Sequence, residues 1–451
     1  MIQLPLDFKQ RMQAQLGAVN FALFEESLNA PTPVSIRLNP TKLKKELPLE
    51  KVAWAEQGYY LKERPLFVAD PLWHAGAYYV QEASSMALEQ AFKKIKELNN
   101  GQLSLLDLCA APGGKSTHIA SLLNENDVLV SNEVIRTRVP VLNENLTKWG
   151  FPNIIITNSD SKDFEHCGEV FDVIVVDAPC SGEGLFRKDE NAVNEWSTAN
   201  AEMCSLRQKR IVDQIINCLK PGGFIIYSTC TYNPNENELQ VKNLCEQGFE
   251  PIAFTFNGQT AAQHQCYPHQ IKGEGFFISL LQKTGTSKAE EPSKNTNPLK
   301  RIKDSSAYQS FIKADNNFIL FRDHVVALND RVFEFLEQLQ NHLTIYSVGT
   351  RVCEKNDKLI LPSDHLPFSW LCNTDAFEIK SLEMQEAISY LGKNAIPHQS
   401  KNKGYVCLQF EGINLGLGKL AGNRINNLFP NEWRLRRSIQ PSEWFTIGQL
   451  G

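Results

Sequence analysis

The segment that most constrains the fold is an apolar run that ends in a loop of small residues. Leu103–Leu108 is a predicted buried strand and Ser116–Leu123 a predicted helix. The loop between them consists of Cys109, Ala110, Ala111, Pro112, Gly113 and Gly114, followed by Lys115. Small residues let the backbone approach a ligand closely, and this strand-loop-helix order is typical of doubly wound α/β folds. The segment therefore predicts an α/β domain with a binding crevice above this strand.

Strands and helices continue to alternate after this segment. The further predicted strands are Val128–Asn132, Ile154–Thr157, Val173–Asp177 and Phe224–Thr229. Helical segments lie between several of them, at Ile135–Trp149 and Ala201–Leu219. Such alternation is typical of a parallel sheet with crossover helices. We expect Lys220–Gly223 to end the last helix as a glycine-rich cap, and Phe276–Leu281 to add an antiparallel strand.

Length and composition indicate several domains around this core. A chain of 451 residues corresponds to roughly three domains of about 150 residues each. We expect an α+β head at 1–100, the core at 101–283, a polar linker at 284–304, an α+β domain at 305–383 and a final region at 384–451. The sequence does not determine the fold of residues 305–383.

Composition also narrows the cellular setting. The eleven cysteines include no Cys-x-x-Cys pair, which argues against a disulfide framework and against a zinc ribbon. The first residues lack the pattern of a signal peptide, and no apolar run approaches the ~20 residues of a membrane span. We therefore expect a cytoplasmic protein with no metal site and no membrane partner. Its oligomeric state cannot be inferred.

Acidic residues near the strand ends favour a nucleoside ligand. Glu133 closes the second strand, at the distance from Gly113 where a carboxylate binds ribose hydroxyls in dinucleotide-type folds. Asp160, just past the third strand, is placed to touch an adenine edge, or alternatively to cap a helix. The Gly114-Lys115-Ser116 sequence also resembles a phosphate loop, but Cys109 stands where that motif needs glycine. A nucleoside cofactor without a triphosphate fits better than a nucleoside triphosphate.

Two thiols stand at the ends of the fourth and fifth strands. Asp177 is followed by Ala-Pro-Cys180, and Cys230 comes directly after Thr229. A lone cysteine at a strand end is usually an inert small hydrophobe. Two at the mouths of adjacent parallel strands suggest a covalent nucleophile acting on an electrophilic substrate.

The charge of the chain reverses sign near its end. Between residues 401 and 437, seven basic residues face two acidic ones, a net charge of +5, whereas the whole chain carries −5. The basic residues are Lys401, Lys403, Lys419, Arg424, Arg434, Arg436 and Arg437. Aromatic residues are interleaved, so RNA or phosphate binding is as plausible here as a solvated surface. Residues 404–419 are predicted to form a β-hairpin.

Three of these segments resemble a known family. Leu106–Ser116, Asp177–Gly182 and Ser228–Tyr232 are similar to the Sun (NSUN) family of S-adenosylmethionine-dependent RNA cytosine-C5 methyltransferases. Two cysteines in Pro-Cys and Thr-Cys contexts are highly specific for it. Gly182–Asp189 resembles the bacterial subgroup that modifies 16S ribosomal RNA, and the tail resembles its PUA-like domain. DNA cytosine-C5 methyltransferases have Gln after their Pro-Cys thiol, whereas Ser181 stands here, so RNA is favoured.

The resemblance implies both a fold and a cofactor. The fold is a Rossmann-like class I methyltransferase core with a mainly parallel seven-stranded sheet, a small α+β N-terminal domain and a C-terminal α+β and PUA-like RNA-binding region. S-adenosylmethionine would contact the loop 109–115 together with Glu133, Asp160 and Asp177. The alternatives are a tRNA substrate, or a ribosome-assembly factor that binds RNA without catalysis.

The resemblance also implies roles for single residues. Cys230 would attack C6 of the cytosine, Cys180 would assist the later elimination, and Asp177 would support the ring at N3. The target base must be unpaired or flipped out of its stack. The expected RNA contacts are Arg37, Lys42, Arg187, Lys188, Lys419 and Arg434.

Overall fold

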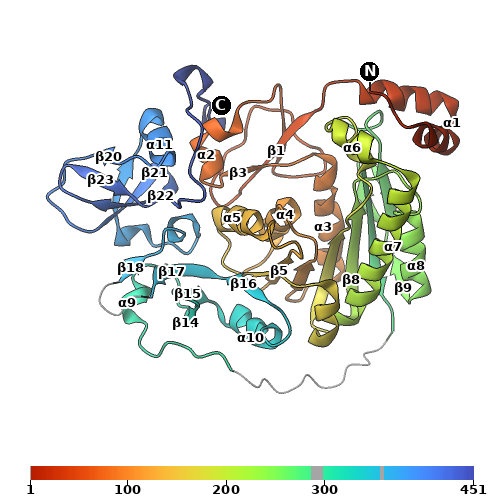
Figure 1. The fold of residues 1–451 in the computed structure, drawn as a ribbon. Coiled ribbons are helices and arrows are strands. Elements are labelled where there is room, and N and C mark those ends of the chain that lie inside the picture. Colours follow the sequence, from red (N-terminus) through yellow and green to blue (C-terminus); the bar gives the residue numbers. More distant parts are fainter. Residues whose placement is uncertain (1, 286–297, 356–359, 451) are drawn as a thin grey trace.

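The computed structural model describes residues 2–285, 298–355 and 360–450, arranged around one large sheet (Figure 1). Nine strands of the described residues form it, in the order β12-β13-β8-β7-β4-β5-β6-β16, with β9 also paired to β13. Their bounds are β4 (Ser104–Asp107), β5 (Val128–Asn132), β6 (Ile154–Thr157), β7 (Phe171–Asp177), β8 (Leu219–Thr229), β9 (Phe249–Pro251), β12 (Gln263–Cys266), β13 (Phe276–Lys283) and β16 (Ile345–Val348). The strands β4 to β8 are parallel, and β13 is antiparallel to β8, as predicted.

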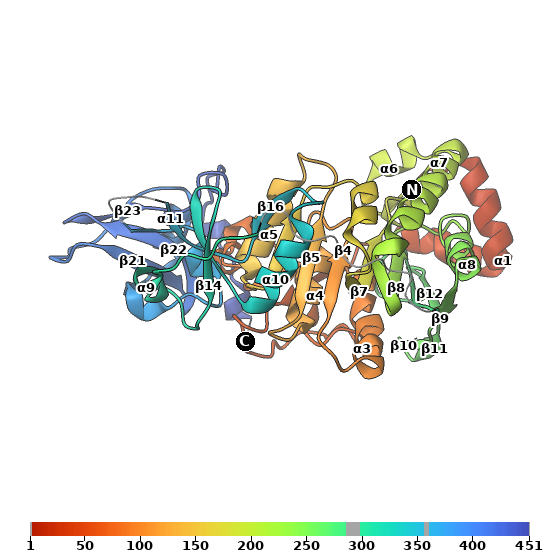
Figure 2. The same ribbon diagram turned by 90° about the horizontal axis from the view of Figure 1, so that it is seen from below.

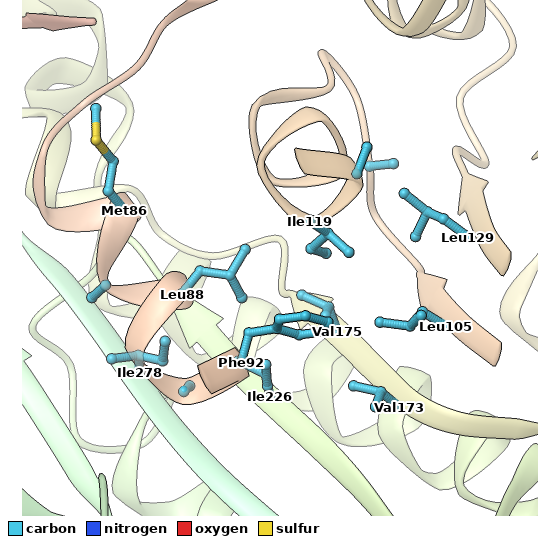
Figure 3. Packing of buried hydrophobic residues seen from close by; sticks show 14 of the residues in the cluster. Met86, Leu88, Phe92, Leu105, Ile119, Leu129, Val173, Val175, Ile226 and Ile278 are labelled. Carbon is cyan, nitrogen blue, oxygen red and sulfur yellow. The ribbon is translucent and has the colours of Figure 1, made fainter. Parts of the chain in front are cut away.

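Helices cover both faces of this sheet. One face packs against α3 (Leu88–Leu98), α4 (Gly114–Leu122) and α5 (Val139–Trp149). The other packs against α7 (Thr198–Ile215), α8 (Glu238–Glu246) and α10 (Asp330–Leu339). Figure 3 shows the first layer, where Phe92 and Ile119 meet strand residues such as Leu105 and Val175. Successive strand residues alternate between the faces, which explains why these strands are continuously apolar and buried.

The strand order places a crevice at β4. The chain passes from β4 outward through β5 and β6, and then returns to the other side of β4 with β7 and β8. Ligands bind in doubly wound sheets at such a reversal, beyond the carboxyl ends of the strands. The loops after β4, β7 and β8 all lie at this edge.

The region 305–383 does not stand apart from the core, contrary to our expectation of a separate domain. Its strand β16 pairs antiparallel with β6 at the edge of the sheet, and α10 packs on the same face as α7. Two segments that are far apart in the sequence are joined here by strand pairing at the edge of the sheet. No local sequence pattern predicts such a pairing. Within the part of the chain that the structure describes, the sheet therefore has nine strands, where seven were expected. Most of the expected linker, residues 286–297, lies outside the described residues.

Lys220–Gly223 does not cap a helix, contrary to our expectation. Helix α7 ends at Ile215 and a 3-10 turn follows, so β8 already begins at Leu219. The register of β8 with β7 shifts between Phe171 and Val173, which accommodates these residues inside the strand.

The head contains a small sheet and a long helix. Its strands have the order β2-β1-β3, with β1 at the predicted Val34–Leu38. The other elements are α1 (Leu6–Leu28), β2 (Gly58–Leu61), α2 (Pro71–His74) and β3 (Tyr78–Val80). Helix α1 is broken at Gly17 and packs over the loops that carry the two cysteines, with Phe8 and Phe24 against Phe186 and Tyr232.

Two further sheets form the C-terminal region, on the opposite side of the core from α1 (Figure 2). The first contains β14 (Asn317–Phe321), β15 (His324–Leu328), β17 (Thr350–Glu354) and β18 (Leu361–Pro362). The second contains β19 (Glu378–Ser381), β20 (Ile396–Pro397), β21 (Tyr405–Phe410), β22 (Ile413–Leu420) and β23 (Arg424–Asn427). Strands β21 and β22 form the predicted hairpin. The remaining α-helices and strands are α6 (Glu190–Glu195), β10 (Phe254–Phe256), β11 (Gln259–Ala261), α9 (Ser306–Gln309) and α11 (Met384–Leu391).

Among the residues that the structure describes, no helix is both long and apolar enough to cross a membrane.

Candidate active site

The two cysteines of the strand ends lie side by side. Their Sγ atoms are 3.3 Å apart, and both are free thiols, partly exposed. The parallel pairing of β7 with β8 sets Asp177 opposite Ser228, so the residues that follow leave the sheet at the same level. Thus the structure brings together the two thiols that lie 50 residues apart in the sequence.

Burial and neighbouring groups favour the protonated form of Cys180. The pKa of Cys180 is raised well above its ordinary value, first by its hydrogen bond with Cys230, then by burial, and further by negative charge on Cys230 and Glu236. Cys180 therefore keeps its proton and can donate it to the Cys230 sulfur. A thiol whose pKa is raised is also the stronger base once it has lost that proton.

Asp177 forms an ion pair at the same edge. Its Oδ2 lies 2.7 Å from Lys115 Nζ, and its Oδ1 accepts a hydrogen bond of 2.9 Å from Ser228 Oγ. Burial would lower the pKa of Lys115, but the Asp177 carboxylate outweighs it and raises that pKa. Lys115 thus stays charged and holds Asp177 next to the thiols.

Neighbouring elements hold the loop after β4. Ala110 N–H donates to Asn132 O at 2.8 Å, Arg138 donates to Ala111 O and Asn145 donates to Pro112 O. Gly113 has φ +114°, a conformation that favours glycine, and α4 begins directly after it. The loop is therefore shaped before any ligand arrives, with Cys109 half-buried at its start.

Buried carboxylate oxygens without hydrogen-bond partners mark this loop as a ligand site. Glu133, directly after β5, accepts from Ile135 N–H at 2.8 Å through its Oε1. Its Oε2 has no hydrogen-bond partner and forms an ion pair of 3.3 Å with Arg138. Asp107 Oδ1 is also buried without a partner, while its Oδ2 accepts from Ser116 at 2.6 Å. Two acceptors beside a pre-shaped loop suit the hydroxyl and amino donors of an adenosyl amino acid.

Asp107 is a site residue that sequence reasoning missed. Burial raises its pKa to about 7. Its position as the last residue of β4 was the available signal, because side chains at the carboxyl ends of such strands face the crevice.

Asp160 caps a helix. It is the N-cap of the 3-10 helix Ser161–Cys167, where its Oδ1 accepts from Lys162 N–H at 3.1 Å. The capping alternative is therefore realised in the structure, and an adenine contact remains a prediction.

Three of the cations expected to bind RNA form contacts inside the protein instead. Arg37 is fully buried and donates to Gln81, Thr117 and Gly114. Arg187 is buried in an ion pair of 2.8 Å with Glu274. These contacts correct the expectation for both residues, because the guanidinium donors are used inside the protein.

The contacts of Lys42 also contradict its expected role in RNA binding, whereas the contacts of three other cations do not. The Lys42 ammonium donates to the backbone oxygens of Ala75 and Lys148. Lys188 lies 3.7 Å from Glu274 and is partly exposed. Lys419 and Arg434 are exposed on the C-terminal region.

Comparisons with known proteins agree with this geometry. Residues 94–282 match the family described as 16S rRNA methyltransferase RsmB/F, and residues 4–83 match the N-terminal domain of 16S rRNA methyltransferase RsmF. Residues 379–435 match the methyltransferase RsmF PUA domain. The ribosomal RNA small subunit methyltransferase F of Vibrio vulnificus is 30% identical over 96% of this chain and 98% of its own length. That of Aeromonas salmonicida is 30% identical over 91% and 92%.

The chain belongs to this family of ribosomal RNA methyltransferases. It is an enzyme that uses S-adenosylmethionine to methylate RNA. Two solved structures share the fold of the family. NSun6 from Pyrococcus horikoshii is 19% identical, with a TM-score of 0.53 over 62% of this chain and 98% of its own. A methyltransferase homolog from the same organism is 25% identical, with a TM-score of 0.50 over 61% and 98%.

Proposed function

We propose that this methyltransferase transfers the methyl group to C5 of one cytosine in 16S ribosomal RNA, through a covalent bond between Cys230 and C6 of the base. The 3.3 Å contact between Cys180 and Cys230 is the observation that carries the proposal. Two thiols in contact serve a reaction in which one sulfur must bond to the substrate and then leave. A target in ribosomal RNA also agrees with the cytoplasmic location expected from the sequence.

Cytosine needs a nucleophile because its C5 is too electron-poor to accept a methyl group directly. Addition of the Cys230 thiolate to C6 breaks the aromatic system and gives C5 enamine character. S-adenosylmethionine supplies an electrophilic methyl group on a sulfonium, which C5 takes. The protein contributes the orientation of the reacting groups and the charges around them.

The second half of the reaction requires a base and a leaving group. Cys180 starts with its proton and donates it to N3 of the ring as negative charge builds there; that proton is lost to solvent when the aromatic ring is restored. Its thiolate then removes the C5 proton, the electron pair of that bond restores the C5–C6 double bond, and Cys230 leaves as a thiolate. Asp177, held by Lys115, supports the amidine side of the ring at N3.

The RNA must present its base outside a helix. C6 of a stacked cytosine is not accessible to a thiol, so the target is unpaired or flipped out. Phosphates on either side of it would then bind exposed cations such as Lys419 and Arg434, and the partly exposed Lys188 of the core.

The experiment compares single-cysteine variants on 16S RNA fragments and on tRNA transcripts. Cys230→Ala removes methyl transfer and covalent adduct while S-adenosylmethionine still binds. Cys180→Ala forms an adduct that survives denaturing electrophoresis and releases RNA at least ~100-fold more slowly. Cys245→Ala, at an exposed free thiol far along the chain, is the control and keeps wild-type turnover.

Each alternative predicts a different result. Turnover by Cys180→Ala without adduct would refute the division of labour between the thiols. Methylation of tRNA in preference to 16S RNA would change the substrate. RNA binding with no methyl transfer by the wild-type protein would favour a non-catalytic assembly factor.

A further inference from the structure

The two loops that carry the cysteines are tied to each other by buried carboxylates. Glu236 follows Cys230 in the chain, yet it accepts hydrogen bonds from Ser181, the residue after Cys180. Glu183 follows Cys180, yet it accepts from Tyr232 N–H, beyond Cys230, at 3.1 Å. Each loop thus supplies a carboxylate that binds a backbone N–H of the other.

The Glu236 side chain holds the chain on both sides of Cys180. Its Oε2 accepts from Ser181 N–H at 2.8 Å and from Gln208 Nε2 at 3.1 Å. Gln208, on α7, also donates to Pro179 O at 3.0 Å. The residues before and after Cys180 are therefore fixed by one network, in which the carboxylate is fully buried.

Glu236 is itself anchored to the strand of Cys230. Its backbone oxygen accepts from the hydroxyl of Tyr227 in β8 at 2.7 Å. Its Oε1 approaches Thr231, next to Cys230, at 3.5 Å. The backbone of Glu236 is bonded to β8, and its side chain binds the Cys180 loop. This residue is therefore suited to set the distance between the two loops.

The position of Cys230 has independent support. Its carbonyl oxygen accepts from Gly184 N–H at 2.8 Å, and a Cβ on Gly184 would lie only 2.8 Å from the same oxygen. Glu183 adds the bond to Tyr232 and is paired with Arg11 at 2.7 Å. Loss of the Glu236 side chain should therefore displace Cys180 more than Cys230.

We propose that Glu236 is a positioning residue that sets the Cys180 thiol against Cys230, and thereby the rate at which methylated RNA leaves the covalent adduct. The inference rests on the proposed function, because it assigns Cys180 to adduct breakdown. Breakdown removes the C5 proton to the Cys180 thiolate and breaks the Sγ–C6 bond of Cys230. A displacement of about 1 Å in a reacting group can cost on the order of 100-fold in rate.

The hydrogen bonds of Glu236 can be separated from its charge by substitution. Its hydrogen-bond partners in the described structure, Ser181, Gln208 and Thr231, are neutral. A glutamine can keep the same contacts, with its oxygen accepting from Ser181 N–H and Gln208, and its NH2 donating to the two hydroxyl oxygens, which then accept. Alanine leaves Ser181 N–H and one N–H of the Gln208 amide without their acceptor, while the other N–H of Gln208 keeps Pro179 O.

The test follows one round of methylation of a 16S RNA fragment by E236A, E236Q and the wild-type enzyme. The readouts are the covalent adduct, the methylated RNA and the affinity for S-adenosylmethionine. E236A should form adduct at a rate within about threefold of wild type but release RNA ~10- to 100-fold more slowly, so that adduct accumulates. E236Q should recover most of the release rate. Glu238→Ala, at an exposed carboxylate two residues further on, is the matched control.

A merely structural role gives a different pattern. If E236A loses adduct formation, cofactor affinity and thermal stability together, or releases RNA like wild type, the proposal is wrong. Failure of E236Q to recover release would also overturn it, because position would then not be the cause. If Cys180→Ala traps no adduct either, the proposed function fails; if Cys180→Ala traps adduct and E236A does not, only this inference fails.

Discussion

The head and the C-terminal region carry cations that look alike in the sequence and are used differently in the fold. Arg37 and Lys42 of the head point their charged groups at internal oxygen atoms. Lys419 and Arg434 of the C-terminal region are exposed. A buried cation requires bonds that compensate for lost hydration, whereas an exposed one is free to meet a phosphate.

The buried cations show that the head supports the cofactor loop. Arg37 belongs to β1, and its guanidinium bonds Thr117 Oγ1 at 2.6 Å and Gly114 O at 3.4 Å, in the first turn of α4. It also stacks on Trp149 at 4.6 Å. The head is therefore joined to the helix that follows the loop 109–113. Lys42 similarly bonds the end of α5 through Lys148 O.

The largest expected effect is that of Arg37→Ala on stability. The substitution leaves buried oxygen atoms of Gln81 and Thr117 without their donor, and we expect a loss of about 3 kcal/mol in the free energy of unfolding. Cofactor affinity should fall as well, because the first turn of α4 is released. Urea denaturation and S-adenosylmethionine binding measure the two effects.

An exposed arginine of the head provides the control. Arg64→Ala should change the free energy of unfolding by less than about 0.5 kcal/mol. If Arg37→Ala were as stable as wild type and weakened only RNA binding, Arg37 would be a direct RNA contact and the contrast between the two regions would disappear.

The same contrast explains which parts of the structure could be predicted from the sequence. Strands such as Val128–Asn132 and Ile154–Thr157 were predicted to the residue because they are buried on both faces and bounded by turns. The convergence of Cys180 and Cys230 followed from parallel pairing of their strands. These features depend on local pattern and on the geometry of a parallel sheet.

Other features depend on contacts that no local pattern records. The pairing of β16 with β6 joins segments about 190 residues apart, and its short, half-buried strand carries no sign of its partner. The carboxylates of Glu236 and Asp107 become significant only when the loops around them close. A basic residue likewise gives no sign of whether its charged group is buried, as Arg187 demonstrates.

The exposed cations lead to the second prediction, of intermediate size. The double variant Lys419→Ala/Arg434→Ala should weaken RNA binding about tenfold at low salt and reduce the slope of log affinity against log salt by roughly 1 to 2. Fewer counterions are released on binding when a phosphate contact has been removed, and the dependence of affinity on salt therefore becomes weaker. Cofactor affinity and thermal stability should not change.

A second pair of cations, the partly exposed Lys94 and the exposed Lys242, tests whether position or net charge matters. Lys94→Ala/Lys242→Ala removes the same charge from α3 and α8. It should leave the salt slope nearly unchanged. Equal effects of the two double variants would mean that RNA binding depends only on the overall charge of the protein. The C-terminal region would then not be a specific RNA-binding surface.

The smallest effect is expected for Lys42→Met, and it should depend on pH. Burial, and then the charge of Lys148, lower the pKa of Lys42 to about 7 in the folded protein from 10.5. Between these values the unfolded chain binds the proton more tightly, so the wild-type contribution of Lys42 to stability grows as pH rises from 7 and is lost as pH falls through 7.

Methionine keeps the apolar stem of Lys42 but has no proton to bind. The stability of wild type relative to Lys42→Met should therefore increase from pH 7 to pH 9.5, reaching about 1 kcal/mol from the two hydrogen bonds that the neutral amine still donates. The exposed neighbour provides the comparison, since Lys44→Met should show no such trend. A difference between wild type and Lys42→Met that stays constant over this range would mean that Lys42 remains charged, and that its side chain reaches solvent as those of the C-terminal cations do.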